Sequence, residues 1–372
     1  MAVRFLSLPA VPIAADRLRA VGILLHRWLG LVVGFVFALV GLTGSVIAFG
    51  PELLAWGQPA LAAPAPGGWE AARASVLART LAAHRPGEVT LVRFPGGALG
   101  AYEIYLADES LEYRHALSGD VLHRRPAMGD TVLISRELHT HLAGGERGEQ
   151  LLGWLGVAML VLLGTGLWLW WPRGGRWRLA LRYPATRQLR PQLYWWHKSG
   201  GIVTFVLLAF VTLTGVAMLF HGAAQALLTG MLGGRAPELP GHVAPADEID
   251  WHAVLATLDR TLPSGRAVFF APPRTNNAPL VFRKRLPAEL HPNGRSFVLL
   301  DGEGRRVAAH DASAAATGLR ATNAIYPLHA GRTGARWWQL TVAVSGILPA
   351  VLFATGFWLW RGRASAGRAT RE

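Results

Sequence analysis

The sequence contains no cysteine and few charged residues. Among its 372 residues there is no Cys, only 16% are Asp, Glu, Lys or Arg, and 51% are hydrophobic. Without Cys, the chain has no disulfides, thiolate-bound metals, iron–sulfur clusters or cysteine nucleophiles, so His or carboxylate must hold any metal. The composition is too apolar for one ordinary soluble domain and is typical of a membrane protein.

A nucleotide-binding fingerprint is also missing. The chain has no G-x-G-x-x-G motif that opens a strand–helix unit and no visible flavin domain. It is therefore not expected to take hydride from a nicotinamide by itself.

Charge is absent from the interior of four apolar runs, at about 27–49, 151–171, 199–220 and 338–360. About 20 such residues cross a hydrocarbon core of ~30 Å, so we expect four transmembrane helices. Ala60-Leu61-Ala62 resembles a signal-peptidase site, which leaves open a cleaved first segment. The apolar core of the first run is longer than the roughly 7–15 residues of a signal peptide and ends well before the Ala-Leu-Ala site, which favours a retained span.

Nearly all of the net charge of +14 lies on one side of the predicted membrane. The N-terminus to Arg27, residues 172–198 and the C-terminal tail hold 15 Lys/Arg and 2 acids, whereas the two long loops hold 22 and 21. Short connections rich in Lys and Arg are typical of the cytoplasmic side, so both termini are predicted to be cytoplasmic. The excess of Lys and Arg over acidic residues is thus explained by the topology in a lipid bilayer, and no nucleic-acid partner is expected.

One pattern of histidine, threonine and glycine occurs twice in the sequence. His139 and His329 each precede a Thr-Gly pair by 26 residues, and His26 and His197 each precede a Leu-Thr-Gly triplet by 16 residues. The fold class predicted is an α-helical membrane protein of four spans in two homologous halves, related by an approximate two-fold axis along the membrane normal.

Each half is expected to carry an external α+β unit. In the first loop, residues 57–68 indicate a linker, 69–84 a helix, 89–94 and 102–106 strands, and 111–123 a hairpin. In the second, residues 250–262 indicate a helix, 267–271 and 280–283 strands, and 296–309 a hairpin. The predicted order is a cytoplasmic N-terminus (1–25), span (26–50), external domain (51–150), span (151–171), basic cytoplasmic loop (172–196), span (197–221), external domain (222–336), span (337–360) and cytoplasmic tail (361–372).

These features resemble a known family. The histidine-led spans, the Thr-Gly pairs, the Trp-rich exits, and loops with LEYRHALSGDVLH and SFVLLDGEGRRVA are similar to the PepSY-associated transmembrane family over about residues 26–360. Its members include ferric-siderophore reductases of the FoxB type in the bacterial inner membrane. The resemblance implies PepSY-like insertions, a multi-pass inner-membrane location with a periplasmic side, and a ferric siderophore or other iron chelate as acceptor.

The four repeat-matched histidines are candidate ligands of two b-type haems. Ligation of haem iron by two imidazoles leaves no open position and suits electron transfer. From the predicted topology, His26 and His197 would share a cytoplasmic-side haem, and His139 and His329 a periplasmic-side haem. For a single interfacial histidine, a headgroup-zone position is the usual explanation. His141 and His221 have no repeat partner and remain alternatives on the external side.

The glycines of the Thr-Gly pairs are predicted to reach the level of these haems from the opposite ends of the spans. They would let a flat macrocycle approach, although small residues also serve plain helix packing. These glycines are Gly44, Gly215, Gly166 and Gly356. Cationic side chains that could bind the haem propionates, or simply anchor the membrane interface, are Arg27, Arg190 and Lys198 on the cytoplasmic side and Arg136, Arg332 and Arg336 outside.

The function indicated is transmembrane electron transfer by a haem-dependent oxidoreductase. A cytoplasmic or membrane donor, either a reductase or a quinol, would supply the electrons, and a ferric siderophore would accept them in the periplasm. Two alternatives stay open: a permease for iron chelates, and a regulatory peptide-binding PepSY membrane protein. A permease would be expected to carry ionisable residues or broken helices near the midplane, and a regulatory protein leaves the matched histidines unexplained.

Overall fold

The computed structural model describes residues 13–172, 176–238, 240–244, 248–273, 275 and 277–369. Parts of the predicted N-terminus (1–12), basic loop (173–175) and C-terminal tail (370–372) lie outside the described residues.

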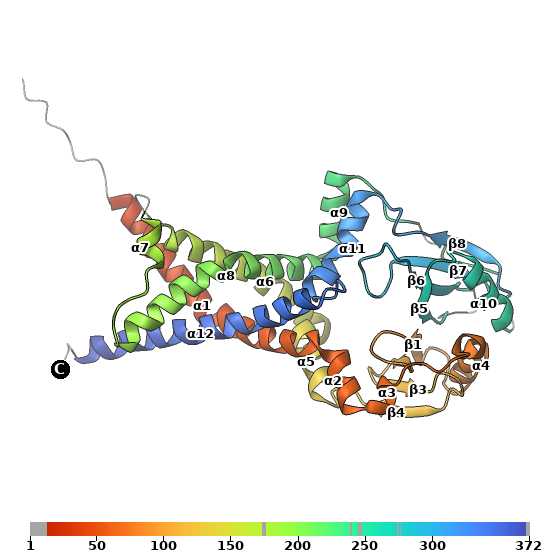
Figure 1. The fold of residues 1–372 in the computed structure, drawn as a ribbon. Helices are drawn as coiled ribbons and strands as arrows, with labels where there is room; N and C mark the ends of the chain where they lie inside the picture. Colours follow the sequence, from red (N-terminus) through yellow and green to blue (C-terminus); the bar gives the residue numbers. More distant parts are fainter. Residues whose placement is uncertain are drawn as a thin grey trace, which may run out of the picture.

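Four long helices form a bundle (Figure 1). They are α1 (Ile13–Ala48), α6 (Gly145–Trp170), α8 (Leu189–Leu219) and α12 (Arg336–Ala369). All four are long and apolar enough to cross a membrane. Large apolar side chains such as Val203 and Val206, which are 76% and 75% exposed, cover the outside of the bundle as a lipid-facing surface requires. The protein is therefore an α-helical membrane protein with four candidate spans.

The bundle has two distinct ends. A β-sheet layer lies at one end, and the first and last described residues lie at the other (Figure 1); we call these the sheet end and the terminal end. Helices α1 and α8 begin before the predicted spans, so His26 and His197 lie within these helices and do not open them.

Close helix crossings hold the bundle together. Where α1 crosses α12, a methyl group on Gly41 or Gly346 would overlap the backbone carbonyl of the other glycine. Ser45 Oγ donates a hydrogen bond to the Ala343 carbonyl at 2.7 Å in the same contact. Helix α6 packs against α8 in turn, with Gly156 against Val216. Lipid removes the hydrophobic driving force for helix association, so close packing at small residues stabilises these contacts instead.

Both long connections contribute to one eight-stranded antiparallel sheet. Its strands are β1 (Val89–Arg93), β2 (Tyr102–Leu106), β3 (Leu111–Arg114), β4 (Val121–Arg125), β5 (Arg266–Ala271), β6 (Leu280–Arg285), β7 (Ser296–Leu300) and β8 (Arg306–His310). The order is β4-β3-β2-β1-β5-β6-β7-β8. The predicted strands and hairpins are confirmed, but the two units are joined where β1 pairs with β5. This pairing satisfies the backbone groups that two separate sheets would each leave open at an edge.

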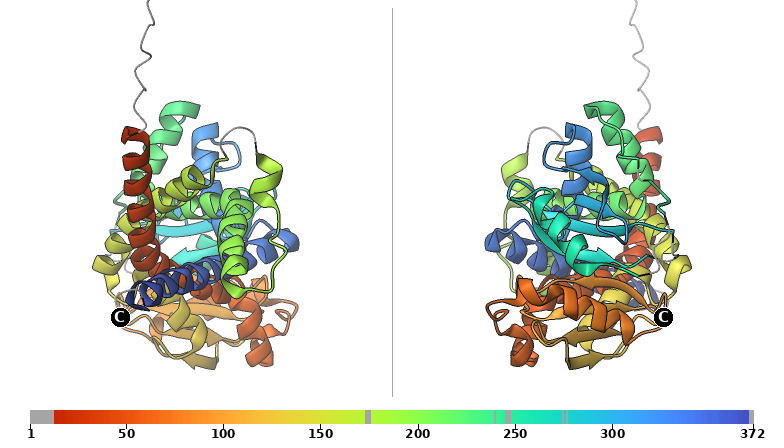
Figure 2. Two further views of the ribbon diagram at one scale, coloured as in Figure 1. Left: turned by 90° about the vertical axis from the view of Figure 1, so that its left-hand side faces the viewer. Right: turned by 90° about the vertical axis from the view of Figure 1, so that its right-hand side faces the viewer.

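The two connections also share one core on the outer face of the sheet. Helices α4 (Trp69–Ala82) and α10 (Trp251–Arg260), both predicted, cover this face side by side (Figures 1 and 2). Leu77 of α4, Leu258 of α10 and Phe270 of β5 are fully buried together. Arg73 binds both carboxylate oxygens of Asp259, at 3.0 and 2.5 Å, and so links α4 to α10.

Short helices connect the sheet to the bundle. They are α2 (Gly50–Gly57), α3 (Pro59–Ala62), α5 (Thr131–His141), α9 (His221–Leu232) and α11 (Thr317–His329), while α7 (Trp177–Leu181) lies at the terminal end. Asp130 caps α5 by accepting hydrogen bonds from the Val132 and Leu133 amides, and it also pairs with Arg125 of β4. Helices α5 and α11 end in His139-Thr140-His141 and His329, between the sheet and the bundle (Figure 1).

Candidate functional site

Four histidines meet as two pairs, one at each end of the bundle. The ring centroids of His26 and His197 lie 6.2 Å apart, with the ring planes at 77°. Those of His139 and His329 lie 6.1 Å apart, at 43°. In both pairs one ring comes from the first half of the chain and the other from the second. The structure therefore brings together the histidines that the repeat pattern and topology paired.

One ring nitrogen of each histidine is already engaged. His139, His197 and His329 donate from Nδ1 to the carbonyls of Val40, Leu352 and Val211, at 2.8, 3.0 and 3.0 Å. A carbonyl only accepts, so in these three rings Nδ1 carries the proton and Nε2 keeps its lone pair. This is the tautomer of a histidine that binds a metal through Nε2.

The threonines of the Thr-Gly pairs take part in the same contacts. Nδ1 of His26, His197 and His329 lies 3.1, 3.1 and 3.2 Å from the hydroxyl oxygens of Thr165, Thr355 and Thr214. Each hydroxyl donates its own proton to a carbonyl one turn back, for example Thr165 to Leu162, so its oxygen accepts from the imidazole. The sequence showed Thr before Gly four times, but our interpretation gave a role only to the glycine.

Each predicted glycine lies against one of the four imidazoles. A Cβ on Gly166 would lie 3.1 Å from Cε1 of His26, and the other contacts are equivalent: 3.1 Å for Gly356 and His197, 3.0 Å for Gly215 and His329, and 2.8 Å for Gly44 and His139. In every case histidine and glycine belong to the same half of the chain. The nearest neighbour of each glycine is thus a histidine ring, and the approach of a macrocycle to these glycines stays a prediction.

A cavity of about 740 Å³ surrounds the His26–His197 pair. This volume falls within the ~300–1,000 Å³ of small-molecule and cofactor pockets. Its walls are mostly apolar and include both predicted glycines, Gly166 and Gly356. The predicted cations Arg27, Arg190 and Lys198 also line it, and Nε of Arg27 is buried without a hydrogen-bond partner. An apolar, flat ligand with anionic groups fits such a lining.

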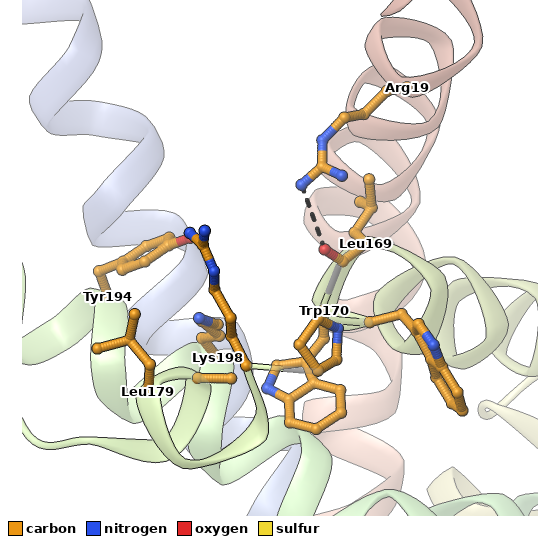
Figure 3. A pocket seen from close by; sticks show the side chains of 10 residues that line it. Arg19, Leu169, Trp170, Leu179, Tyr194 and Lys198 are labelled. Atoms are coloured by element: carbon orange, nitrogen blue, oxygen red, sulfur yellow. Dashed lines mark hydrogen bonds between the residues drawn. The ribbon is translucent and has the colours of Figure 1, made fainter. Parts of the chain in front are cut away.

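A smaller pocket of about 310 Å³ continues this cavity at the terminal end (Figure 3). The two share Arg19, Leu169, Trp170, Tyr194 and Lys198. Arg19 donates to the Leu169 carbonyl at 3.5 Å, across the pocket from Lys198. We call this pocket the vestibule; it combines aromatic walls with positive charge.

The three predicted cations of the sheet end have different surroundings. Arg332 donates to the Ala48 carbonyl at 2.8 Å and lies 3.4 Å from Glu52, and Arg336 lies 3.6 Å from the same carboxylate. Arg136 is exposed on α5. Gln339 also donates to Glu52, at 2.9 Å, so Glu52 joins α2 to the start of α12. No motif or repeat position in the sequence marks this carboxylate.

The two alternative histidines lie outside the pairs. His141 Nδ1 is 3.1 Å from Glu137, and its Nε2 is 4.0 Å from Glu149. His221 is exposed at the start of α9.

The spacing of the pairs suits a six-coordinate iron. An imidazole nitrogen lies about 2.0 Å from a bound transition metal and about 1.1 Å from its own ring centroid, so one iron between two coaxial imidazoles separates the centroids by about 6.2 Å.

Burial lowers the pKa of His329 to about 4, with His139 adding to the effect, and it also lowers the pKa of His139. Both rings are therefore neutral, the state that binds metal.

The histidine pairs supply too few ligands for a metal ion without a porphyrin. Within the described ranges, no cluster of three or more His, Asp or Glu side chains could hold one. A histidine pair supplies two ligands, and a porphyrin would supply the remaining four. Where the residues fit a cofactor, they fit a haem best.

The chain matches the model of a known protein family. The model of the PepSY-associated TM region matches residues 23–363, from α1 to α12. No curated protein sequence matches the chain significantly.

Proposed function

We propose that this chain, which belongs to the family of the PepSY-associated TM region, is a di-haem electron-transfer protein that carries electrons across a membrane to an iron chelate. The observation that carries the proposal is the pair of facing imidazoles at each end of the bundle, with centroids 6.1 and 6.2 Å apart. Repetition of the same arrangement at both ends is hard to attribute to interfacial anchoring.

The residues would act as follows. His26 and His197 would hold one b-type haem and His139 and His329 a second, each through Nε2. When bound, a haem with two imidazole ligands supplies one-electron transfer without an open coordination site. The carbonyls of Val40, Val211 and Leu352 orient the rings and make them more basic.

The terminal-end cavity contains cationic side chains that could bind the anionic groups of a cofactor. Arg27, Arg190 and Lys198 line it, and the guanidinium of Arg is suited to bidentate contact with a carboxylate such as a propionate. Its apolar walls exclude water, which keeps the charge interactions strong.

The repeated contacts also support two homologous halves related by an approximate two-fold axis. Each half seats its own histidines on its own glycines, and each pair forms between halves. We propose the cytoplasm for the terminal end and the periplasm of a bacterial inner membrane for the sheet end, from the basic termini and the basic loop.

The proposed acceptor is a ferric siderophore or a similar chelate at the sheet end. One electron converts each ferric ion to ferrous, and the weaker ferrous complex releases its metal. A quinol or a cytoplasmic reductase would donate at the terminal end, where the vestibule opens the cavity. Oxidation of one quinol would reduce two ferric ions and release two protons.

The test uses purified protein in sealed vesicles. After expression with ample haem, the protein should show a reducible b-type spectrum. Vesicles that contain trapped ferricyanide should then lose it when dithionite is added outside, whereas vesicles with the His26→Ala/His139→Ala variant should not. Absence of a reducible haem, or ferricyanide loss equal to that of the variant, would rule out the proposal.

A further inference from the structure

The inner face of the sheet, which is turned toward the bundle, carries one continuous row of side chains. Helices α4 and α10 lie on the outer side of the sheet, and α5 and α11 lie on the bundle side (Figure 1). The alternate residues of the strands pack against α4 and α10, so the residues of this row belong to the bundle side. Tyr113 of the row accordingly packs with Leu133 of α5. Cross-strand pairing from β4 to β8 gives the order His123, Tyr113, Glu103, Arg93, Phe269, Arg283, Phe297 and His310.

The centre of this row is strongly basic. Arg283 pairs across the strands with Phe269, whose ring lies 5.3 Å below the guanidinium of Arg93. Arg266 and Arg285 are paired with each other beside them. We call Arg93, Arg266, Arg283 and Arg285, together with Arg295 just before β7, the arginine face. The acid of the row, Glu103, lies 3.6 Å from Arg93.

Most of these cations have no counterion. The side chains of Arg266, Arg283, Arg285 and Arg295 form no hydrogen bond or ion pair with any residue that the structure describes. Nε of Arg295 is in addition buried. The nearby carboxylate of Glu289 is already used by the backbone amides of Leu286 and Arg295.

The crowded positive charges repel one another. Burial, followed by repulsion from Arg285 and Arg93, lowers the pKa of Arg266, and burial with repulsion from Arg283 lowers that of Arg295. Packed cations without partners destabilise a fold, and a bound anion removes that cost. The arrangement is thus suited to an anionic ligand.

The arginine face adjoins the histidine pair of the sheet end. The segment between β6 and β7 carries His291, whose ring stacks on Tyr326 of α11 at 4.9 Å. Tyr326 lies one turn before His329 on the same helix. A ligand on the arginine face would therefore lie on the bundle side of the sheet, next to the helix that holds His329.

We propose that the arginine face binds an anionic ferric chelate whose free oxygens are carboxylates. The assignment rests on the proposed function for the identity of the metal, and it narrows the acceptor to negatively charged chelates. Guanidinium groups match carboxylates in bidentate geometry, and the partly exposed Phe297, paired with Arg283, supplies apolar contact beside them.

The test measures binding without electron transfer. The full chain in nanodiscs of neutral lipid is titrated with gallium citrate, a redox-inert stand-in for ferric citrate, by calorimetry. Removal of two charge-assisted contacts in Arg283→Gln/Arg285→Gln should weaken binding about tenfold or more. Arg260→Gln, which removes one charge from α10 on the outer face, should stay within about twofold of the wild type. Arg266→Gln repeats the test if the double variant does not fold.

Three results would overturn this proposal: equal affinity in wild type and Arg283→Gln/Arg285→Gln, tighter binding of a cationic gallium trihydroxamate than of gallium citrate, or variant effects seen only with anionic lipid vesicles. Loss of the haem spectrum with intact gallium citrate binding would instead contradict the proposed function alone.

Discussion

His139 and His329 lie with their ring centroids 6.1 Å apart, although one ends α5 and the other ends α11. Their Nδ1 atoms donate to the carbonyls of Val40 in α1 and Val211 in α8. Each ring is therefore oriented by a spanning helix of its own half before it meets the other ring. Such support from surrounding groups is what a preformed ligand site requires.

The contact between Gly166 and His26 predicts a selective loss of cofactor. Gly166→Val should displace the His26 ring, because even a Cβ would lie 3.1 Å from its Cε1. We expect the variant to keep one of two haems, measured by absorbance in pyridine. Gly164→Val is the matched control on the same helix, since an added Cβ there meets nothing within 4 Å. Equal haem content in the two variants would contradict this role of Gly166.

The hydroxyl of Thr355 should tune the His197 site. In Thr355→Val, the His197 Nδ1 keeps the Leu352 carbonyl but loses a second acceptor at 3.1 Å. A less basic imidazole stabilises ferrous iron, so we expect a higher midpoint potential and haem affinity lower by about tenfold. Spectroelectrochemistry checks the potential. Thr204→Val, which removes a similar hydroxyl that bonds only to its own helix, should leave the potential unchanged.

The Glu52 carboxylate should stabilise the contact between α2 and α12. Arg332, Arg336 and Gln339 all converge on it. Because the group is partly exposed, we expect Glu52→Ala to lower the free energy of unfolding by only about 1 kcal/mol. Thermal unfolding in detergent measures the change. Glu238→Ala, at an exposed loop position, is the control, and an equal effect of both variants would argue against this role of Glu52.

Acid should destabilise the sheet layer through His291. Burial, with Arg295, Arg283 and Arg285 nearby, lowers the pKa of His291 to about 3, below the value of about 6.5 in the unfolded chain. The unfolded state therefore binds more protons between these values, and stability falls as the pH drops from about 6.5 toward 3, by roughly 1–2 kcal/mol at pH 5.

The matching variant is His291→Phe, which keeps a ring to stack on Tyr326. Its melting temperature should depend less on pH between 7 and 4.5 than that of the wild type. His252→Phe, at an exposed position of α10, serves as the control. An unchanged pH dependence in His291→Phe would show that His291 is not the titrating group.

Local sequence patterns and the repeat together made much of this architecture predictable. Apolar run length located the four helices, and alternation located strands such as β2 and β6, because those signals depend on local sequence. The pairing of His26 with His197 followed from counting spans. A residue's place in a repeat constrains its partner more than its chemical type does.

The long-range contacts were not visible in the sequence. Pairing of β1 with β5 joins strands that are far apart in the chain, and no local pattern specifies which edges meet. The Nδ1 acceptors at Val40, Val211 and Leu352 are backbone carbonyls, which side-chain identity does not reveal. Likewise, three basic residues follow one another at Arg283-Lys284-Arg285, yet Lys284 points into the core, to the carbonyls of Leu258 and Thr261, while its two neighbours belong to the opposite face.

Haem stoichiometry tests the central claim most directly. The wild type should contain two haems per chain by pyridine haemochrome, His26→Gly and His139→Gly one each, and the double variant none. Added imidazole should restore the missing haem in each single variant, which separates ligand loss from misfolding. A wild type without haem, or a His139→Gly variant with two haems while His141→Ala or His221→Ala loses one, would contradict the account.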